Sequence, residues 1–293
     1  MKHVFIINPV SGIGNYKKVI AWVEKHFDAH DFDIHITKYR GHAQEIAATY
    51  EKDAILYAVG GDGTAFEVVN GMSFENEFCV IPVGTGNDFF KMIPYEGEVI
   101  DLLRDTVYGG TTDHIDVGQV NDHYFLNCAN IGVDADINAH ANSLKGKLMI
   151  PRLMIYMVAA LKEVMKMKPV KLKISNDVFE YHKDITLLSI MNGRFYGSGF
   201  KSAPKALIKD GLLDVCIVDG VGRLRAMKLL PKYMKGKHEN FDIVEFKYVT
   251  ELDIQADKEV IYGCDGEIFK GNHLKIKHHP GILKYRIPKG VKL

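Results

Sequence analysis

The first third of the chain alternates short apolar runs with amphipathic stretches, and polar, glycine-rich junctions separate them. Apolar strands are predicted at 4–7, 32–37, 54–59 and 78–82, and helices at 16–27, 43–50, 66–72 and 98–108. This alternation is typical of a parallel, doubly wound α/β sheet. Ligands bind at the carboxyl ends of the strands in such sheets, so the polar turns should meet in one crevice.

From about Ile115 the pattern changes to short strands with turn signals between them. These strands are predicted at 115–120, 124–129, 170–175, 184–191, 213–218 and 242–252, with helices at 148–167 and 224–235. This pattern of short strands and turns predicts a mainly antiparallel sheet or β-sandwich. We therefore expect an N-terminal α/β domain over 1–114 and a β-sandwich domain over 115–270.

The predicted helix at 148–167 is rich in methionine and ends in lysines. Its apolar residues recur at helical spacing, and Lys162, Lys166 and Lys168 lie near its end. Two interpretations stay open, a helix packed on the core and an amphipathic helix that touches lipid.

Composition narrows the functional classes. The chain has 293 residues, 47% of them hydrophobic and 25% charged, and a formal net charge of zero, so no basic field predicts a nucleic-acid partner. No apolar run approaches the roughly 20 residues of a membrane span, so membrane contact should be peripheral. The four cysteines are far apart and form no CxxC pair, which favours reduced thiols in the cytoplasm.

The junction Gly60-Gly61-Asp62-Gly63-Thr64 follows a buried strand and precedes a helix. Glycines let backbone N–H groups approach a ligand, and the spacing of Thr64 and Glu67 predicts a capping box that starts the helix at Thr64. The helix start would then attract phosphate. Asp62 repels phosphate unless a divalent cation lies between them. The alternative is a corner in which Asp62 only fixes the turn.

Two further polar turns, 8–14 and 83–88, follow the first and fourth predicted strands. Neither a GxxxxGK[ST] nor a GxGxxG motif occurs in the chain. In the second domain, Asp210-Gly211 is either a hairpin turn or part of a Mg²⁺ site. Asp265 and Glu267, two residues apart, would face one side of an extended segment, where one could act as a base. A solvated turn is equally consistent with that spacing.

Four ordered motifs resemble the diacylglycerol kinase catalytic-domain family, and the match spans nearly the whole chain. They are Asn8-Pro9-x-Ser11-Gly12, Gly60-Gly61-Asp62-Gly63-Thr64, Gly84-Thr85-Gly86-Asn87-Asp88 and Asp265-Gly266-Glu267. The resemblance implies an α/β nucleotide-binding domain of the NAD kinase/diacylglycerol kinase type and a C-terminal β-sandwich lipid-binding domain. It also implies that residues 271–293 return to the first domain.

The resemblance further implies ATP-dependent phosphorylation of a lipid hydroxyl, with diacylglycerol giving phosphatidic acid as the leading reaction. The implied nucleotide contacts are Asn8, Pro9, Val10, Ser11, Gly12, Thr37, Gly61, Asp62, Gly63, Thr64, Ala65, Phe66, Glu67 and Thr85. A catalytic Mg²⁺ would be held by Asp62 and, through water, by Asp88 and Asp116. A structural Mg²⁺ would be held by Asp210 and the carbonyls of Leu207 and Leu212. Asp265 or Glu267 would take the hydroxyl proton.

One position departs from the family pattern. Related kinases often have a basic residue directly after the Asn-Pro-x-Ser-Gly turn, where this chain has Ile13. Either Lys17 or Lys18 supplies that charge from the following helix, or the carboxylate network of the site is built differently.

The alternatives are an NAD kinase-like enzyme and a nucleotide-binding regulator. The Asn-Glu motif of NAD kinases occurs downstream only at Asn76-Glu77, directly after the central helix, which disfavours the first. The second is disfavoured because a regulator without catalysis has no reason to retain carboxylates whose desolvation is costly. The sequence leaves the lipid and the oligomeric state open, a homodimer included. The enzyme should be cytoplasmic and meet its lipid transiently at the membrane surface.

Overall fold

The computed structural model describes residues 1–293 except 13, 29 and 145–151, and the chain divides into two compact units. The first unit comprises Met1–Asp116 and Gly281–Leu293, and the second comprises Val117–Pro280. The sequence places these boundaries at 114/115 and 270/271. The later boundary differs by ten residues because β13 (Glu267–Ile287) is one continuous strand with no pattern break at 270.

The first unit is built on a parallel sheet. Its strands lie in the order β13-β4-β3-β1-β2, where β1 spans Lys2–Ile7, β2 Phe32–Ile36, β3 Ala54–Gly60 and β4 Glu77–Pro82. All of β3 is buried, which explains its continuous apolar run. The end of β13 completes the sheet by pairing Lys284 and Tyr285 with the start of β4 in parallel.

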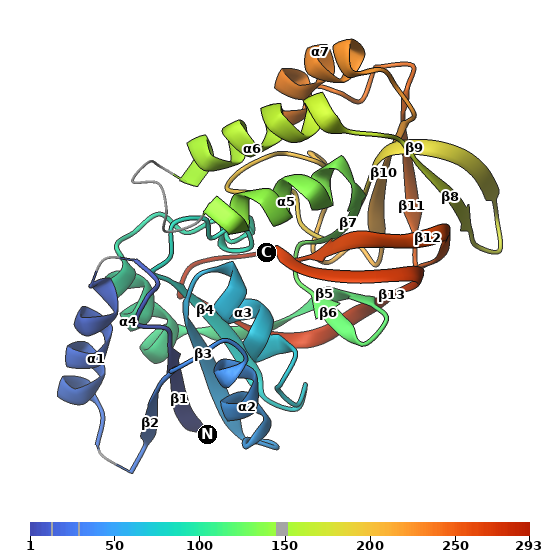
Figure 1. The fold of residues 1–293 in the computed structure, drawn as a ribbon. Coiled ribbons are helices and arrows are strands. Elements are labelled where there is room, and N and C mark those ends of the chain that lie inside the picture. The colour runs from blue at the N-terminus through green and yellow to red at the C-terminus, as the bar shows by residue number, and fades with distance from the viewer. Residues whose placement is uncertain (13, 29, 145–151) are drawn as a thin grey trace. The chain divides into compact units, whose positions relative to one another are not determined.

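Helices cover both faces of this sheet (Figure 1). On one face α1 (Asn15–His26) packs on α4 (Val99–Gly109), and on the other α2 (His42–Ala48) packs on α3 (Asp62–Val69). Strand residues alternate accordingly, since Phe5 and Tyr57 join Val19 and Leu102 in the core under α1 and α4. The predicted doubly wound arrangement is confirmed.

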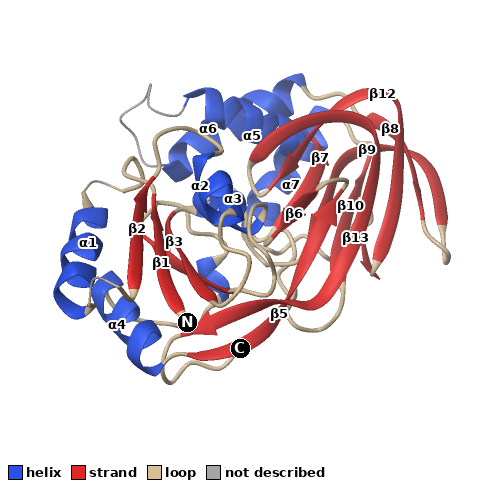
Figure 2. Ribbon diagram, turned by 90° about the horizontal axis from the view of Figure 1, so that it is seen from below, coloured by secondary structure: helices blue, strands red, loops and turns tan. Residues whose placement is uncertain are grey.

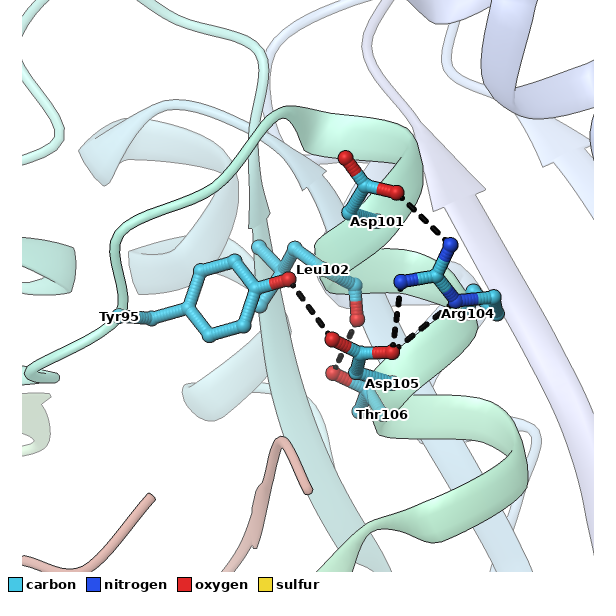
Figure 3. Close-up of polar contacts among 6 residues, drawn as sticks. All are labelled: Tyr95, Asp101, Leu102, Arg104, Asp105 and Thr106. Atoms are coloured by element: carbon cyan, nitrogen blue, oxygen red, sulfur yellow. Dashed lines mark hydrogen bonds and ion pairs between the residues drawn. The ribbon is translucent and has the colours of Figure 1, made fainter. Parts of the chain in front are cut away.

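Polar contacts hold the chain segment after β4 against α4 (Figure 3). The Tyr95 hydroxyl donates to Asp105 Oδ2 at 3.0 Å, and Arg104 bridges Asp101 and Asp105 at 2.8 and 3.0 Å. Thr106 Oγ1 donates to the Leu102 carbonyl inside the helix. A short 3-10 turn, η1 (Phe90–Met92), lies earlier in the segment. The loop that carries the third polar turn is thus fixed at its far end.

The second unit is mainly antiparallel (Figure 2). Its strands are β5 (Thr111–Val120), which starts in the first unit, β6 (His123–Phe125), β7 (Cys128–Gly132), β8 (Val170–Ser175), β9 (Glu180–Met191), β10 (Leu213–Asp219), β11 (Val244–Val249) and β12 (Glu251–Cys264). The long strands β9 and β12 each pair with β8 through one half and with β7 through the other. This sharing of strands makes the predicted β-sandwich.

Three helices lie over this sheet: α5 (Val133–Leu144), α6 (Arg152–Lys166) and α7 (Arg223–Met234). The sequence predicts α6 and α7, with residues 148–151 of the first prediction outside the described part of the chain. It misses α5, and its strand at 124–129 is wrong, because β6 ends at Phe125 and β7 begins at Cys128. Polar Asp134 and Asn138 lie on the buried face of α5, so the apolar helical period is absent there. In the described part of the chain, no helix has both the length and the apolar character to span a bilayer.

Candidate active site

The first two polar turns of the first unit are joined by Asn8. Its backbone N–H donates to the Val59 carbonyl at 2.9 Å, and its side-chain Nδ2 donates to Thr64 Oγ1 at 3.2 Å. Its Oδ1 accepts from the Val10 N–H, which folds the turn after β1 back on itself. Asn8 therefore fixes the turn after β1 against the start of α3.

The third turn joins the same group. The N–H groups of Val83 and Gly84 both donate to the Gly60 carbonyl, at 3.0 and 3.1 Å. Asp62 Oδ1 accepts from the Phe89 N–H at 3.2 Å, so the carboxylate also holds this turn. The three turns therefore meet at one edge of the sheet, as the alternating pattern predicts.

Glycine is required where the first and third turns touch. Gly12 has a φ of +62°, and a Cβ there would lie 1.8 Å from the Val83 carbonyl oxygen. Gly14, two residues on, also has positive φ (+75°), but a Cβ would meet nothing within 4 Å. The two glycines have similar backbone conformations, but a Cβ would make a close contact only at Gly12.

We expect Gly12→Ala to lower both the free energy of unfolding and the activity that the sequence predicts, phosphorylation of a lipid, far more than Gly14→Ala. Positive φ costs either variant about 1–2 kcal/mol, whereas only alanine at 12 must push the two turns apart. Urea unfolding and initial-rate assays on both variants measure the difference. Equal losses in the two would show that the contact with Val83 does not position the site.

Helix α3 begins at Asp62, two residues before the predicted start, and the capping box is wrong. Glu67 instead accepts from the N–H groups of Gly41 and Ala43, at 2.9 and 3.1 Å, and so caps α2. The Thr64 hydroxyl is used by Asn8. The N-cap of α3 is Gly61, which has no side chain that could cap the helix. The first N–H groups of α3 and its positive dipole end therefore suit a phosphate.

The three carboxylates predicted to hold a catalytic cation are placed differently from one another. Asp88 is buried and pairs with Lys91 Nζ at 2.5 Å, and Asp116 is buried and accepts from the Gly281 N–H at 2.8 Å. Within the described ranges, no three His, Cys, Asp or Glu side chains lie close enough to share a metal ion. The three carboxylates therefore do not form one direct metal cluster, and the predicted arrangement, with Asp62 on the cation and Asp88 and Asp116 acting through water, stays a prediction.

Oxygen donors of the kind that Mg²⁺ takes are nonetheless present beside Asp62. The Asn87 side chain donates to the Gly84 carbonyl at 2.8 Å, while its Oδ1 is buried without a hydrogen-bond partner among the described residues. Carboxylate and amide oxygens suit this hard cation. The residues of the turns thus fit both a phosphate and its counter-ion.

The remaining predicted nucleotide contacts lie around these turns. Thr37 directly follows β2, and its backbone N–H donates a hydrogen bond to the Ile7 carbonyl at 2.8 Å. Val10 is 88% exposed, and Thr85 is exposed in the third turn. Pro9, Ser11, Gly63, Ala65 and Phe66 belong to the turn after β1 or to α3. Ile13, where the family often has a basic residue, lies outside the described residues.

Asp265 and Glu267 do not lie on one extended segment, so the expected spacing argument is wrong. Asp265 and Gly266 form the two-residue turn between β12 and β13, with φ of +46° and +88°. Cys264 pairs with Glu267 across this hairpin. Positive φ at both turn residues is typical of a type I′ hairpin, for which Asp-Gly is a favoured sequence.

The Asp265 carboxylate organises the loop between β6 and β7. Oδ2 accepts from the Leu126 N–H at 2.6 Å, and Oδ1 accepts from the N–H groups of Asn127 and Cys128, both at 2.9 Å. These residues are more than 130 positions away in the sequence. Asp265 therefore has a structural role that the motif does not reveal.

Asp210 forms a local turn, since its Oδ1 accepts from the Leu212 N–H at 3.1 Å around Gly211. Leu207 is about half exposed. Burial, then the charges of Asp210 and Glu239, raise the pKa of Asp214 from 3.8 to about 7. Negative charge therefore gathers at this turn, and the structural Mg²⁺ remains a prediction.

The sequence does not predict the buried carboxylate of Asp134. It is fully buried at the start of α5 and accepts hydrogen bonds from Ser189, Tyr196 and Tyr233. Desolvation raises its pKa from the ordinary 3.8 to about 6, although the three hydroxyl donors oppose that shift. The residue fixes α5 to β9 and α7.

This raised pKa gives stability a definite pH dependence. The folded state binds the proton more tightly, so the contribution of Asp134 is present below pH 4 and is lost as the pH rises through about 6. At 1.36 kcal/mol per pKa unit the loss is about 3 kcal/mol. We expect Asp134→Asn to flatten this slope in urea unfolding between pH 4 and 7, and the exposed control Asp177→Asn to leave it unchanged.

If the free energy of unfolding of Asp134→Asn depended on pH as steeply as that of the wild type, Asp134 would not be the cause of the dependence. Part of the pH dependence should remain in the variant, because burial and then Glu163 raise the pKa of Asp136 to about 6 as well.

Two family models match consecutive parts of the chain. The diacylglycerol kinase catalytic domain matches residues 2–120, and the YegS C-terminal NAD kinase beta sandwich-like domain matches residues 127–286. The diacylglycerol kinase of Bacillus subtilis (strain 168) is 31% identical over 295 residues, which cover 97% of this chain and 96% of that protein. The chain belongs to the diacylglycerol kinase catalytic-domain family.

Solved structures of other proteins share the fold of this kinase. A diacylglycerol kinase from Bacillus anthracis str. Sterne superposes with a TM-score of 0.73 at 21% identity and covers 99% of this chain and 97% of that one. An NAD kinase from Archaeoglobus fulgidus in complex with ATP superposes with a TM-score of 0.56 at 10% identity, covering 98% and 93%. At these identities the likeness extends to the fold alone.

Membership makes this protein a lipid kinase, a phosphotransferase that uses ATP. The predicted fold class, an α/β nucleotide-binding domain with a C-terminal β-sandwich, is confirmed. The NAD kinase alternative retains only the shared fold.

Proposed function

We propose that this kinase transfers the γ-phosphate of ATP to the free hydroxyl of diacylglycerol and releases phosphatidic acid and ADP. The observation that carries the proposal is the group of three turns at one sheet edge, joined by Asn8 and Asp62 at the glycine-capped start of α3. The name of the relative with 31% identity supports diacylglycerol as the acceptor.

The turns supply positioning and charge neutralisation, which are the main requirements of phosphoryl transfer. The N–H groups at the start of α3 would receive the ATP phosphates. Asp62 would hold Mg²⁺, with Asp88 and Asp116 acting through water, and this cation would neutralise charge on the phosphate oxygens. Asp210 and the carbonyls of Leu207 and Leu212 would hold a second Mg²⁺ that stabilises the second unit.

Asp265 or Glu267 would accept the proton of the lipid hydroxyl as the new O–P bond forms and ADP leaves with the electrons of the broken P–O bond. Asp265 accepts hydrogen bonds from three N–H groups of the loop between β6 and β7 through both of its oxygens, so it also has a positioning role. The lipid would be met at a membrane surface by transient contact, and no nucleic acid is needed. A homodimer is compatible with these roles.

The test is transfer of labelled γ-phosphate from ATP, with Mg²⁺, into diacylglycerol, phosphatidylglycerol, a sphingoid base and a polyprenol in mixed micelles, with NAD as a parallel acceptor. We expect label in diacylglycerol, and omission of Mg²⁺ should abolish it. Label in another lipid alone would overturn diacylglycerol as substrate. Label in NAD alone would overturn the lipid acceptor, and ATP binding without any transfer would indicate a regulator.

A further inference from the structure

Helix α6 is apolar on both of its faces. On one face Ile155, Tyr156, Ala159, Ala160 and Val164 are buried and join the core of the second unit. On the other, large apolar side chains are 38–52% exposed, namely Met154, Met157, Val158, Leu161 and Met165. We call these five residues the α6 stripe. At 100° per residue they form a band about 100° wide. The helix is therefore packed on the core, which confirms the first interpretation of the sequence, and it still presents an apolar surface, so lipid contact stays a prediction.

Positive charge surrounds the stripe. Lys162 and Lys166 are exposed on α6, and Lys168 follows the helix. Helix α7, which packs against α6 (Figure 1), lies in a segment, 221–237, with six lysines and arginines and no acidic residue. Arg225 pairs with Asp242, whereas Arg223, Lys228 and Lys232 have no acidic partner in the part of the chain that the structure describes. For a chain of zero net charge, this is a marked local excess.

We propose that the α6 stripe, with the cations of α6 and α7, docks this kinase on a membrane surface that contains anionic phospholipid. An apolar band bordered by lysine and arginine complements a bilayer interface, where apolar side chains enter the acyl boundary and cations meet phosphate headgroups. Methionine suits this role because its flexible side chain adapts to an irregular surface. The inference rests on the proposed function, because an enzyme that phosphorylates a membrane lipid must reach the bilayer.

Vesicle sedimentation tests the docking surface directly. Wild-type protein should bind phosphatidylglycerol vesicles at least 10-fold more tightly than phosphatidylcholine vesicles, and salt should weaken that binding. Met157→Ser/Leu161→Ser should lower vesicle affinity at least 10-fold at every salt concentration. Lys228→Glu/Lys232→Glu should lower it mainly at low salt. The controls Val178→Ser/Tyr248→Ser and Lys25→Glu/Lys52→Glu change exposed residues elsewhere and should bind as wild type does.

The outcomes separate docking from catalysis. Asp62→Asn should bind vesicles normally, and the stripe variant should phosphorylate a short-chain, water-soluble diacylglycerol at the wild-type rate. Vesicle binding that depends on the stripe, in a protein that phosphorylates no lipid, would support docking and contradict the proposed function. Unchanged binding by the stripe variant would overturn the docking proposal. So would a stripe variant that dissociates a dimer in light scattering while it binds vesicles normally, since the stripe would then be a contact between copies.

Discussion

Asp62→Asn is expected to lower kcat for lipid phosphorylation by roughly 10²–10³-fold, the cost of losing one charge-stabilising group, while the fold stays intact. The asparagine keeps an oxygen that can accept from the Phe89 N–H, so the third turn remains tied to α3. It removes the negative charge that would hold Mg²⁺ against the ATP phosphates. Initial rates with saturating lipid and ATP, together with urea unfolding, measure the two effects separately.

A graded series distinguishes the turn-fixing role of Asp62 from the cation-binding role. Asp62→Ala removes both the charge and the acceptor for Phe89, so it should abolish activity and also lower stability. Asp177→Asn is the matched control, because it removes an exposed carboxylate outside the turns. Normal turnover by Asp62→Asn would show that the carboxylate only fixes the corner. This is the alternative that the sequence leaves open, in which Asp62 has no role in binding a cation.

Glu267→Gln is expected to lower kcat by about 10²-fold or more with little change in the KM for ATP, as for a lost general base. Glutamine keeps the size of the side chain and a carbonyl oxygen, and the backbone pairing of residue 267 with Cys264 is unchanged, so the free energy of unfolding should stay close to that of the wild type. Glu259→Gln, an exposed substitution on β12, is the control. Single-turnover rates with pre-bound ATP isolate the chemical step.

Asp265→Ala should differ by also destabilising the protein. It strips an acceptor from three N–H groups of the buried residues Leu126, Asn127 and Cys128, at a cost of about 3 kcal/mol or more. Asp265→Asn keeps one acceptor oxygen and should be less destabilised. Loss of turnover in Asp265→Asn with normal turnover in Glu267→Gln would assign the base to Asp265. Normal turnover in both variants would show that neither Asp265 nor Glu267 is the general base.

The parts of the fold that the sequence predicts are those with a local signal. Strand β3 is apolar throughout, and β1 and β4 are apolar after their polar first residues, because helices cover both faces of the sheet, and the glycine-rich turns follow these strands directly. Helix α5 gives no such signal, because Asp134 and Asn138 occupy its buried side. The hydroxyls of Ser189, Tyr196 and Tyr233, far along the chain, make a buried carboxylate tolerable there.

The site shows the same division between local and distant causes. The spacing of Thr64 and Glu67 matches a capping box, yet both side chains take tertiary partners instead, Asn8 and the start of α2. Asp265 is recognised by its motif, but its partners at 126–128 are set by folding. Motifs therefore identify the candidate residues, whereas the contacts of those residues depend on chain segments that no local pattern relates to them.

The route of β13 sets an order for biosynthesis. The sheet of the first unit pairs β4 with Lys284 and Tyr285, and Arg286 reaches Glu77 at 3.0 Å, so one edge is closed by a segment that is synthesised 209 residues after Glu77. Until that segment is made, β4 presents open backbone groups that can pair with another chain. The nascent kinase thus carries an unprotected sheet edge while the whole second unit is synthesised, and the ATP-binding unit completes its fold only when the end of β13 returns to it.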